Sequence, residues 1–116
     1  MKTLLSLVFL LSTSAFALTT GEKAPDFTLK GTNPKNQDIS LSNFKGKIVV
    51  LEWLNHGCPF VRKHYDSGNM QSLQKKYTDK NVVWLSIISS APGKQGHVDT
   101  AGAIKDKTDN KSSATD

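Results

Sequence analysis

The sequence predicts a single small α/β domain built around a βαβ unit. Residues 48–54 and 81–89 are largely apolar, which is typical of parallel strands covered on both faces. Between these two runs, apolar residues recur at helical spacing. Strand, helix and strand in this order predict two parallel strands joined by a crossover. Two shorter segments before them alternate in polarity and predict an N-terminal β-hairpin.

The hairpin is expected to pair residues 26–30 with residues 38–42. In both segments polar and apolar residues alternate with the period of a half-buried strand. The connection at 31–36 contains glycine, asparagine and proline, as turns do. Residues 42–46 then predict one helical turn that ends at Gly46.

The helical region between the two apolar strands is expected to begin directly after Cys58. Pro59 suits the first helical position, where its missing N–H has no role. The apolar pattern breaks at 66–69 and then resumes, so two helices are expected, with Asn69 capping the second. The residues expected on the apolar helix faces are Phe60, Val61, His64, Tyr65, Met70, Leu73 and Tyr77.

The two ends of the chain differ from this domain in composition. Residues 1–17 match a secretory signal peptide, with Lys2, a short apolar stretch and an Ala-x-Ala site at 15–17. The stretch is too short to span a bilayer, so we expect an exported, periplasmic or otherwise extracytoplasmic protein without stable membrane association after cleavage. Residues 18–97 form the expected domain. Residues 98–116 are polar and predict a disordered tail, because they offer little apolar surface to bury.

The distribution of charge excludes one class of partner. The net charge is +5, and its basic residues are spread along the chain without a basic block that alternates with aromatic residues. A nucleic-acid partner is therefore not expected. The glycines at 93 and 96 lack phosphate-binding spacing, and no cofactor is expected.

Cys58, the single cysteine of the chain, is the main candidate for chemistry. It lies where the first apolar strand ends and a proline-led helix begins, at the sheet edge that carries catalytic groups in such folds. The positive end of a helix dipole stabilises the thiolate, which is the reactive form. Arg62 and Lys63, about one turn further on, add positive charge. The alternative is a small, inert core cysteine.

Two histidines near Cys58 raise the question of a metal site. His56 and His64, together with Cys58, could bind copper or zinc. No second cysteine completes a soft ligand set and the spacing matches no known ligand pattern, so no metal site is expected. His64 is expected to pack on the apolar helix face. The aromatic residues expected in the core are Trp53, Phe60 and Trp84.

Three stretches of the chain carry a family resemblance: residues 20–29, residues 39–51 and the motif Cys58-Pro59-Phe60-Val61-Arg62-Lys63. Together they resemble the alkyl hydroperoxide reductase/thiol-specific antioxidant family, the redoxins. The resemblance implies a thioredoxin-like fold and a peroxide- or disulfide-reducing activity at Cys58. In exported thioredoxin-like proteins a second cysteine stands where this chain has Val61, so an intramolecular disulfide cycle is excluded here.

The resemblance also implies a proton-transfer role for Glu52, and the chain departs from the family pattern at other positions. Thioredoxins place a buried acidic residue six positions before the cysteine, and Glu52 occupies that position. The alternative is an edge position from which Glu52 reaches water. Peroxiredoxins carry a proline and a threonine where this chain has Leu51 and Asn55. The family fold continues with further strands, so an incomplete C-terminal half is expected in this chain.

The sequence therefore predicts an exported thiol oxidoreductase or antioxidant of the redoxin class, with Cys58, Glu52 and Arg62 as its site residues. The substrate would be a peroxide or a disulfide, and an external thiol reductant or a partner thiol/disulfide protein would restore Cys58. Two alternatives stay open. One is a non-catalytic thioredoxin-like binding module with Cys58 as a docking thiol or metal ligand. The other is a truncated remnant whose sheet lacks edge strands.

Overall fold

The computed structural model describes residues 17–33, 35 and 37–116. The predicted signal peptide, residues 1–17, therefore lies outside the described residues apart from Ala17. None of the helices in the described part is long and apolar enough to cross a membrane. The elements follow in the order β1 (Thr28–Lys30), β2 (Asp38–Ser40), a 3₁₀ turn η1 (Leu41–Phe44), β3 (Val49–Trp53), α1 (Pro59–Asp66), α2 (Asn69–Thr78), β4 (Val83–Ile87) and α3 (Thr100–Asp109).

The predicted N-terminal hairpin is confirmed. β1 and β2 pair antiparallel, with Thr28 opposite Ser40 and Lys30 opposite Asp38. The hydroxyls of Thr28 and Ser40 lie 2.6 Å apart, and Lys30 Nζ lies 2.7 Å from Asp38 Oδ1. The chain then makes the short turn η1, and Gly46 follows it with a φ of 79°, in the left-handed region that favours glycine.

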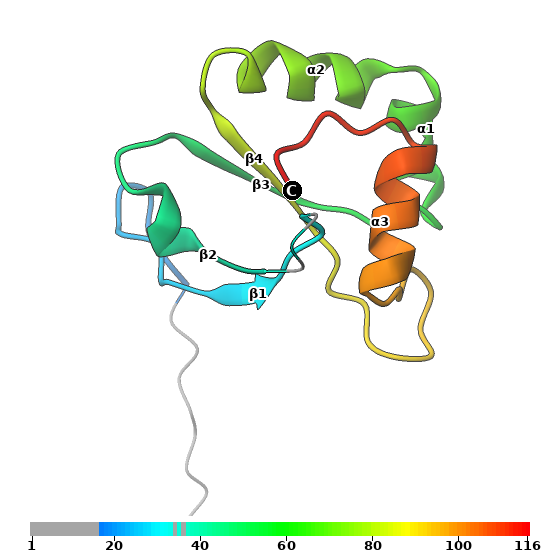
Figure 1. The fold of residues 1–116 in the computed structure, drawn as a ribbon, viewed down its shortest axis with the longest axis horizontal. Coiled ribbons are helices and arrows are strands. Elements are labelled where there is room, and N and C mark those ends of the chain that lie inside the picture. The colour runs from blue at the N-terminus through cyan, green and yellow to red at the C-terminus, as the bar shows by residue number, and fades with distance from the viewer. Residues whose placement is uncertain (1–16, 34, 36) are drawn as a thin grey trace, which may run out of the picture.

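The predicted βαβ unit is also confirmed. β3 and β4 pair parallel in a register that runs from Val49 opposite Val83 to Trp53 opposite Ile87. Figure 1 shows α2 on one side of this pair and the hairpin on the other. The buried apolar side chains of the described core include Tyr65 of α1 and three consecutive residues of β4, Val83, Trp84 and Leu85.

β3 differs from the expected central strand, because within the described residues it pairs with β4 alone. Ile48 O accepts a hydrogen bond from Val83 N, and Leu54 N donates to Ile87 O. The backbone N–H and C=O groups of successive residues point to opposite edges of a strand. In β3 those of the even-numbered residues point to β4, and those of the odd-numbered residues point to the opposite edge. Trp53, at the end of β3, is 61% exposed. Among the described residues β3 is therefore an edge strand with an uncovered last residue, which corrects the expectation of a central strand covered on both sides.

The C-terminal residues differ from the disordered tail expected over 98–116. α3 forms there, and the Asp99 carboxylate accepts from Gly102 N at 2.8 Å, which caps the first turn. Beyond α3, Thr115 N donates to Trp84 O and Ser86 N donates to Asp116 O, both at 2.8 Å. The composition argument failed because this segment is held by hydrogen bonds to the outer edge of β4 and to Gln74 of α2, and because its small Ala114 is buried.

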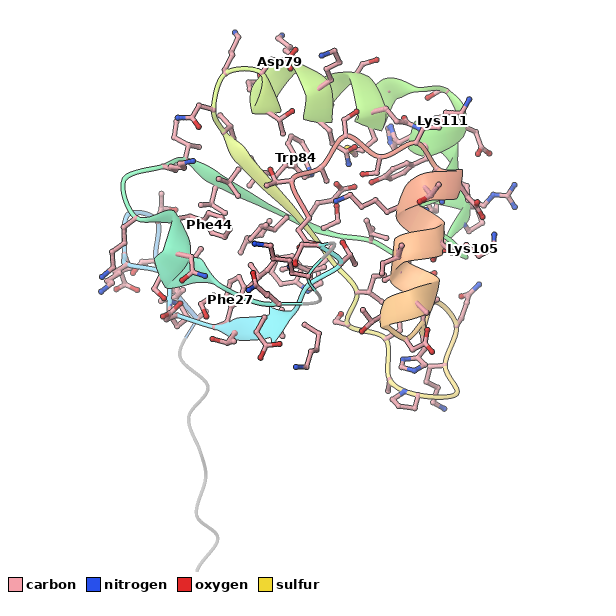
Figure 2. The ribbon with its side chains drawn as sticks, in the orientation of Figure 1. Phe27, Phe44, Asp79, Trp84, Lys105 and Lys111 are labelled. Carbon is pink, nitrogen blue, oxygen red and sulfur yellow. The ribbon has the colours of Figure 1, made fainter. Side chains whose placement is uncertain are left out.

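The C-terminal segment therefore closes one edge of the two-stranded sheet. The Asp116 carbonyl oxygen accepts a hydrogen bond from Ser86 N, and Asp116 N donates to Trp84 O. This is the hydrogen-bond pattern of two parallel strands paired at Leu85. Figure 1 shows this last segment, in red, running from α3 back to the middle of the molecule. Trp84 lies in the interior near it, whereas Asp79 and Lys111 lie at the periphery (Figure 2). The ordered chain thus continues past the boundary expected at residue 97.

Candidate functional site

Cys58 lies where the sequence places it, between the end of β3 and the start of α1. Cys58 is the N-cap residue of α1 and has extended backbone angles, and Pro59 is the first helical residue. The Cys58 N–H donates to Asn55 O at 2.9 Å, which closes a tight turn after β3. The cysteine is half-buried and free. Cys58 is therefore neither enclosed in the core nor fully exposed at the N-terminus of the helix.

The start of α1 offers hydrogen-bond donors to this sulfur. The first amides of a helix have no partner inside the helix, and Pro59 has no N–H to offer. The amides of Phe60 and Val61 are therefore the nearest candidates, and no side-chain cap from Cys58 occupies them. The first turn contains no acidic residue, and Lys63 and His64 lie in the last turn. The N-terminus of α1 therefore presents backbone donors, and no acidic side chain, beside Cys58.

The turn that carries Cys58 is fastened to the loop after β4. Asn55 Oδ1 accepts from Gly57 N at 2.8 Å, and Asn55 Nδ2 donates to Gln95 O at 3.2 Å. Gln95 Nε2 in turn donates to Gly57 O at 3.0 Å. These bonds hold the backbone just before the thiol in one conformation. Sequence reasoning missed Gln95, because an exposed glutamine in a loop carries no pattern that separates it from other polar loop residues.

Gly96 is required for this contact between the two loops. Its φ is 81°, in the left-handed region, and a Cβ at this position would overlap the Asn55 side chain. Gly93, in the same loop, has a φ of 75° but nothing within 4 Å of the equivalent Cβ. The backbone of the loop after β4 therefore approaches Asn55 closely at Gly96 and not at Gly93.

Glu52 is the centre of a polar network between the strands and the helices. Its carboxylate accepts from Tyr65 of α1 (3.0 Å), Gln74 of α2 (3.1 Å) and Trp84 of β4 (2.7 Å). Gln74 Nε2 also reaches Tyr65 Oη at 3.0 Å, and Gln74 is fully buried. Burial and the adjacent negative charge of Glu52 raise the pKa of Tyr65, so its hydroxyl stays a donor.

Two environments were considered for Glu52, a buried position suited to proton transfer and an edge position that reaches water. The structure matches neither of them in full. The side chain is half-buried and three donors surround it, so it does not simply reach water from an edge. Its hydrogen bonds within the described residues go to the network and none goes to Cys58. The three partners were not identified from the sequence. Gln74 carried a signal, because it interrupts the apolar stripe formed by Met70, Leu73 and Tyr77 at helical spacing.

Arg62 is directed along α1 and away from its N-terminus. The guanidinium lies 3.8 Å from the Asp66 carboxylate, one turn further along the helix, and both side chains are 65% exposed. The backbone N–H of Arg62 donates to Cys58 O at 3.0 Å as part of the helix. The described structure thus gives the Arg62 side chain a partner in Asp66 and no contact with Cys58, and solvent screens the charge of this exposed pair.

The histidines do not gather around Cys58. His64 was expected to pack but is exposed, with Nδ1 3.1 Å from Asn69 Nδ2. The His56 ring lies edge-on to the Tyr65 ring, with centroids 4.9 Å apart, and His56 Nδ1 is buried without a hydrogen-bond partner among the described residues. In the described part of the chain no three histidine, cysteine or acidic side chains come together as metal ligands.

Phe60 and Trp53 were expected in the core, but the structure exposes both. Phe60, beside Cys58 in the chain, is 79% exposed, and Trp53 at the end of β3 is 61% exposed. Both expectations were wrong because each assumed covering elements that the described residues do not supply. Trp84, also expected in the core, is buried.

Comparisons with known proteins agree with this arrangement. The model of the AhpC/TSA family matches residues 20–106. In its fold the chain is similar to the thioredoxin domain of a thiol-disulfide oxidoreductase from Bacteroides vulgatus, with a TM-score of 0.56 and 25% sequence identity. That match covers 83% of this chain and 61% of the other, so the chain spans less than two thirds of that domain. A comparison with curated proteins found no match. The chain has a thioredoxin-like fold and belongs to the AhpC/TSA family.

Proposed function

We propose that this protein is an exported thiol-dependent oxidoreductase that acts through Cys58 as its only nucleophile. The observation that carries the proposal is the half-buried cysteine at the N-terminus of α1, next to unoccupied helix amides, in a chain of the AhpC/TSA family. The thiol-disulfide oxidoreductase domain to which the fold is similar supports the same class of reaction.

Two substrates fit this nucleophile. With a disulfide, the Cys58 thiolate attacks one sulfur, a mixed disulfide forms and the other sulfur leaves as a thiolate. With a peroxide, the thiolate attacks one oxygen, the O–O bond breaks, and Cys58 becomes a sulfenic acid while hydroxide or alkoxide leaves. The amides of Phe60 and Val61 are placed to stabilise negative charge on the sulfur in both cycles.

Reducing equivalents must come from outside the chain, because Cys58 is its single cysteine and Val61 occupies the position of a resolving cysteine. In the disulfide cycle, an external thiolate attacks the Cys58 sulfur of the mixed disulfide. That step releases the second substrate thiol and leaves Cys58 in a mixed disulfide with the external thiol. A second external thiolate then attacks the external sulfur of this mixed disulfide, so that Cys58 leaves as a thiolate. In the peroxide cycle, a first external thiol condenses with the sulfenic acid and releases water, and a second thiol then frees Cys58. The external thiol is oxidised to its disulfide in each case.

Glu52 and Arg62 enter the proposal in different ways. Glu52 holds Tyr65, and through it fixes α1 against the strands, so we assign it a positioning role for the helix that carries Cys58. Proton transfer would have to pass through that network. Arg62 adds a screened positive charge one helical turn from the thiolate.

The direct test is the reactivity of Cys58 in the purified chain without residues 1–17. We expect alkylation by iodoacetamide at neutral pH faster than that of free cysteine. We also expect turnover of a peroxide or a small disulfide only when an external thiol is supplied. Cys58→Ser should abolish turnover with an unchanged thermal melt. Alkylation no faster than free cysteine, together with no turnover, would overturn the enzymatic proposal.

Export is tested separately. The match of residues 1–17 to a signal peptide supports it. Expression of the full chain in a bacterial host with a periplasm, followed by fractionation and mass measurement, should give a periplasmic product that begins at Leu18. Uncleaved protein in the cytoplasm would contradict this part of the proposal and leave the chemistry of Cys58 unaffected.

A non-catalytic binding module is the second candidate, and the exposed apolar side chains of Phe60 and Trp53 favour it. Under this reading Cys58 forms a lasting mixed disulfide or a metal contact without turnover. A stable adduct with a disulfide that external thiol does not release would select the module. The absence of a cooperative transition in a circular dichroism melt would instead indicate a remnant.

A further inference from the structure

The edge of β3 that faces away from β4 carries unpaired backbone groups. Because the even-numbered residues of β3 bond to β4, the N–H and C=O groups of Val49, Leu51 and Trp53 point outward. None of these groups has a hydrogen-bond partner among the described residues. The opposite edge of the sheet differs, because β4 bonds there to residues 115 and 116. The described sheet therefore has one closed edge and one open edge.

The open edge lacks the features that protect exposed strands from pairing. Natural edge strands carry a proline, an outward charge or a bulge that blocks a further strand. β3 has no proline, and its register with β4 is unbroken from Val49 to Trp53. Its one charged residue, Glu52, is engaged in the hydrogen-bond network with α1, α2 and β4. Nothing in β3 itself therefore opposes the addition of another strand.

The run of free backbone groups is bounded on both sides. Before β3, Lys47 N already donates to Phe44 O at 3.1 Å, and after it Asn55 O already accepts from Cys58 N at 2.9 Å. The free run therefore spans residues 49–53 and is centred on Leu51.

This centred run is complementary to itself. An antiparallel second copy can place residue 49 opposite 53, residue 51 opposite 51 and residue 53 opposite 49, which bonds every free group of both edges. A shift of two residues in either direction would set a free group against Lys47 N or Asn55 O, which are already bonded. A two-fold axis at Leu51 gives the register without such a loss.

The side chains at the two ends of β3 also fit a second copy. In the two-fold register β3 starts in one copy where it ends in the other, so Lys47 of one copy lies near Trp53 of the other. Both side chains are exposed, and an ammonium over an indole ring is a favourable cation–π contact. Two parallel copies would instead place Lys45 and Lys47 beside their own equivalents, where like charges repel.

We propose that two copies of this chain associate through the open edge of β3, in an antiparallel pair centred on Leu51. The two sheets then become one, in the order β4, β3, β3, β4, and the exposed Trp53 packs beside Val49 of the other copy. The two Cys58 residues lie at opposite ends of the β3 pair, beyond the reach of a disulfide. The association is therefore independent of the oxidoreductase chemistry proposed for Cys58.

The first test is the mass of the purified chain in solution, measured by sedimentation in a reducing buffer. We expect the mass to rise from one chain to two as the concentration is raised, and Cys58→Ser to behave alike. A mass of one chain up to about 1 mM would overturn the proposal. A dimer that is lost with reductant or with Cys58→Ser would also overturn it, because the cysteine would then be the link.

Cysteine variants of the Cys58→Ser chain test the register. Leu51→Cys places two thiols across the two-fold axis, where paired Cα atoms lie about 5.5 Å apart, so the short thiol cross-linker dibromobimane should give covalent dimers. Val49→Cys is the matched control, because its two thiols lie four residues out of register, more than about 13 Å apart. Equal cross-linking of both variants, or cross-linking of Val49→Cys alone, would contradict the register.

A charge exchange tests the same register in exposed side chains and stays informative if a cysteine variant does not fold. Trp53→Lys brings an ammonium near Lys47 of the other copy and should weaken association at least about tenfold. Adding Lys47→Glu should restore it, because a carboxylate then meets that ammonium. Phe60→Lys makes the same change at an exposed aromatic residue outside β3 and should leave association unchanged. Loss of the dimer with Phe60→Lys but not with Trp53→Lys would place the contact on α1 and overturn the proposal.

Discussion

The two sides of the β3–β4 pair each hold one interior carboxylate, and the two carboxylates differ in how completely they are hydrogen-bonded. On the side of α1 and α2, Glu52 accepts hydrogen bonds from three donors on three different elements. On the side of the hairpin, Asp116 accepts hydrogen bonds through Oδ1 only, and its Oδ2 is buried without a partner among the described residues. A saturated carboxylate serves the fold, because every donor around it depends on it. A half-bonded carboxylate contributes less to the fold, because one of its oxygens stabilises no donor.

The largest expected effect tests the first half of this comparison. Glu52→Gln places an amide N–H among donors that need an acceptor, so at least one donor at Tyr65, Gln74 or Trp84 loses its partner. We expect the free energy of unfolding to fall by about 3 kcal/mol, measured by urea denaturation.

Asp116→Asn is the matched change on the other side. The amide oxygen can still accept from Thr32, and its NH₂ replaces an oxygen that has no partner in the described structure. We expect a loss of about 1 kcal/mol or less. Equal losses for Glu52→Gln and Asp116→Asn would remove the distinction between the two carboxylates.

Gly96→Ala sharpens the comparison at the turn that carries Cys58, which is also held by completed polar bonds. The new methyl group overlaps Asn55 and adds left-handed strain, so we expect about 2 kcal/mol of destabilisation and slower alkylation of Cys58. Gly93→Ala is the control, because it introduces the same strain without the overlap. It should cost about 1 kcal/mol and leave the alkylation rate unchanged. A slower rate in both variants would show that strain alone, without the contact to Asn55, controls the cysteine.

Tyr65 links the Glu52 network to pH. Its pKa is raised in the folded protein, so above the unfolded value of about 10 the unfolded chain loses its proton first. The folded state then binds more protons than the unfolded state, and stability must fall as pH rises beyond about 10, by up to about 1.4 kcal/mol per pH unit.

This decline is checked by urea denaturation between pH 8 and about 11. Tyr65→Phe should be less stable than the original chain near neutral pH and should show a shallower decline at alkaline pH. Tyr77→Phe is the matched control on the exposed face of α2 and should keep the full decline. The same slope in Tyr65→Phe as in the original chain would assign the alkaline loss to other groups.

The sequence predicted the parts of the fold that depend on local patterns. The hairpin, the two parallel strands and the place of Cys58 before Pro59 follow from alternation, apolar runs and the preference of proline for a helix start. The partners of Glu52 could not be predicted, because Gln74 and Trp84 come from elements more than twenty positions away. The order of the C-terminal segment depends on the unpaired edge of β4, and no composition rule contains that information.

Exposure was the property least accessible to sequence. Trp53 and Phe60 are residue types that are common in protein cores. Whether they are covered depends on which elements lie opposite them. Arg62 shows the same difficulty for charge. Its spacing from Cys58 suits a contact with the thiolate, yet the next turn of α1 offers Asp66, and the structure pairs Arg62 with that carboxylate.

Arg62→Ala is therefore expected to have the smallest effect. Exposed ion pairs of this kind contribute roughly 0.2–0.5 kcal/mol, so the thermal melt should hardly move. The rate of Cys58 alkylation at low salt should fall by less than about twofold, and added salt should remove the difference, because only a screened charge has been lost. Lys63→Ala, which removes the neighbouring charge, is the control and should behave alike. A tenfold fall with Arg62→Ala that persists at high salt would mean that the guanidinium leaves Asp66 and contacts the thiolate directly. The site would then have a second working residue besides Cys58, and the helix amides would carry less of the stabilisation assigned to them here.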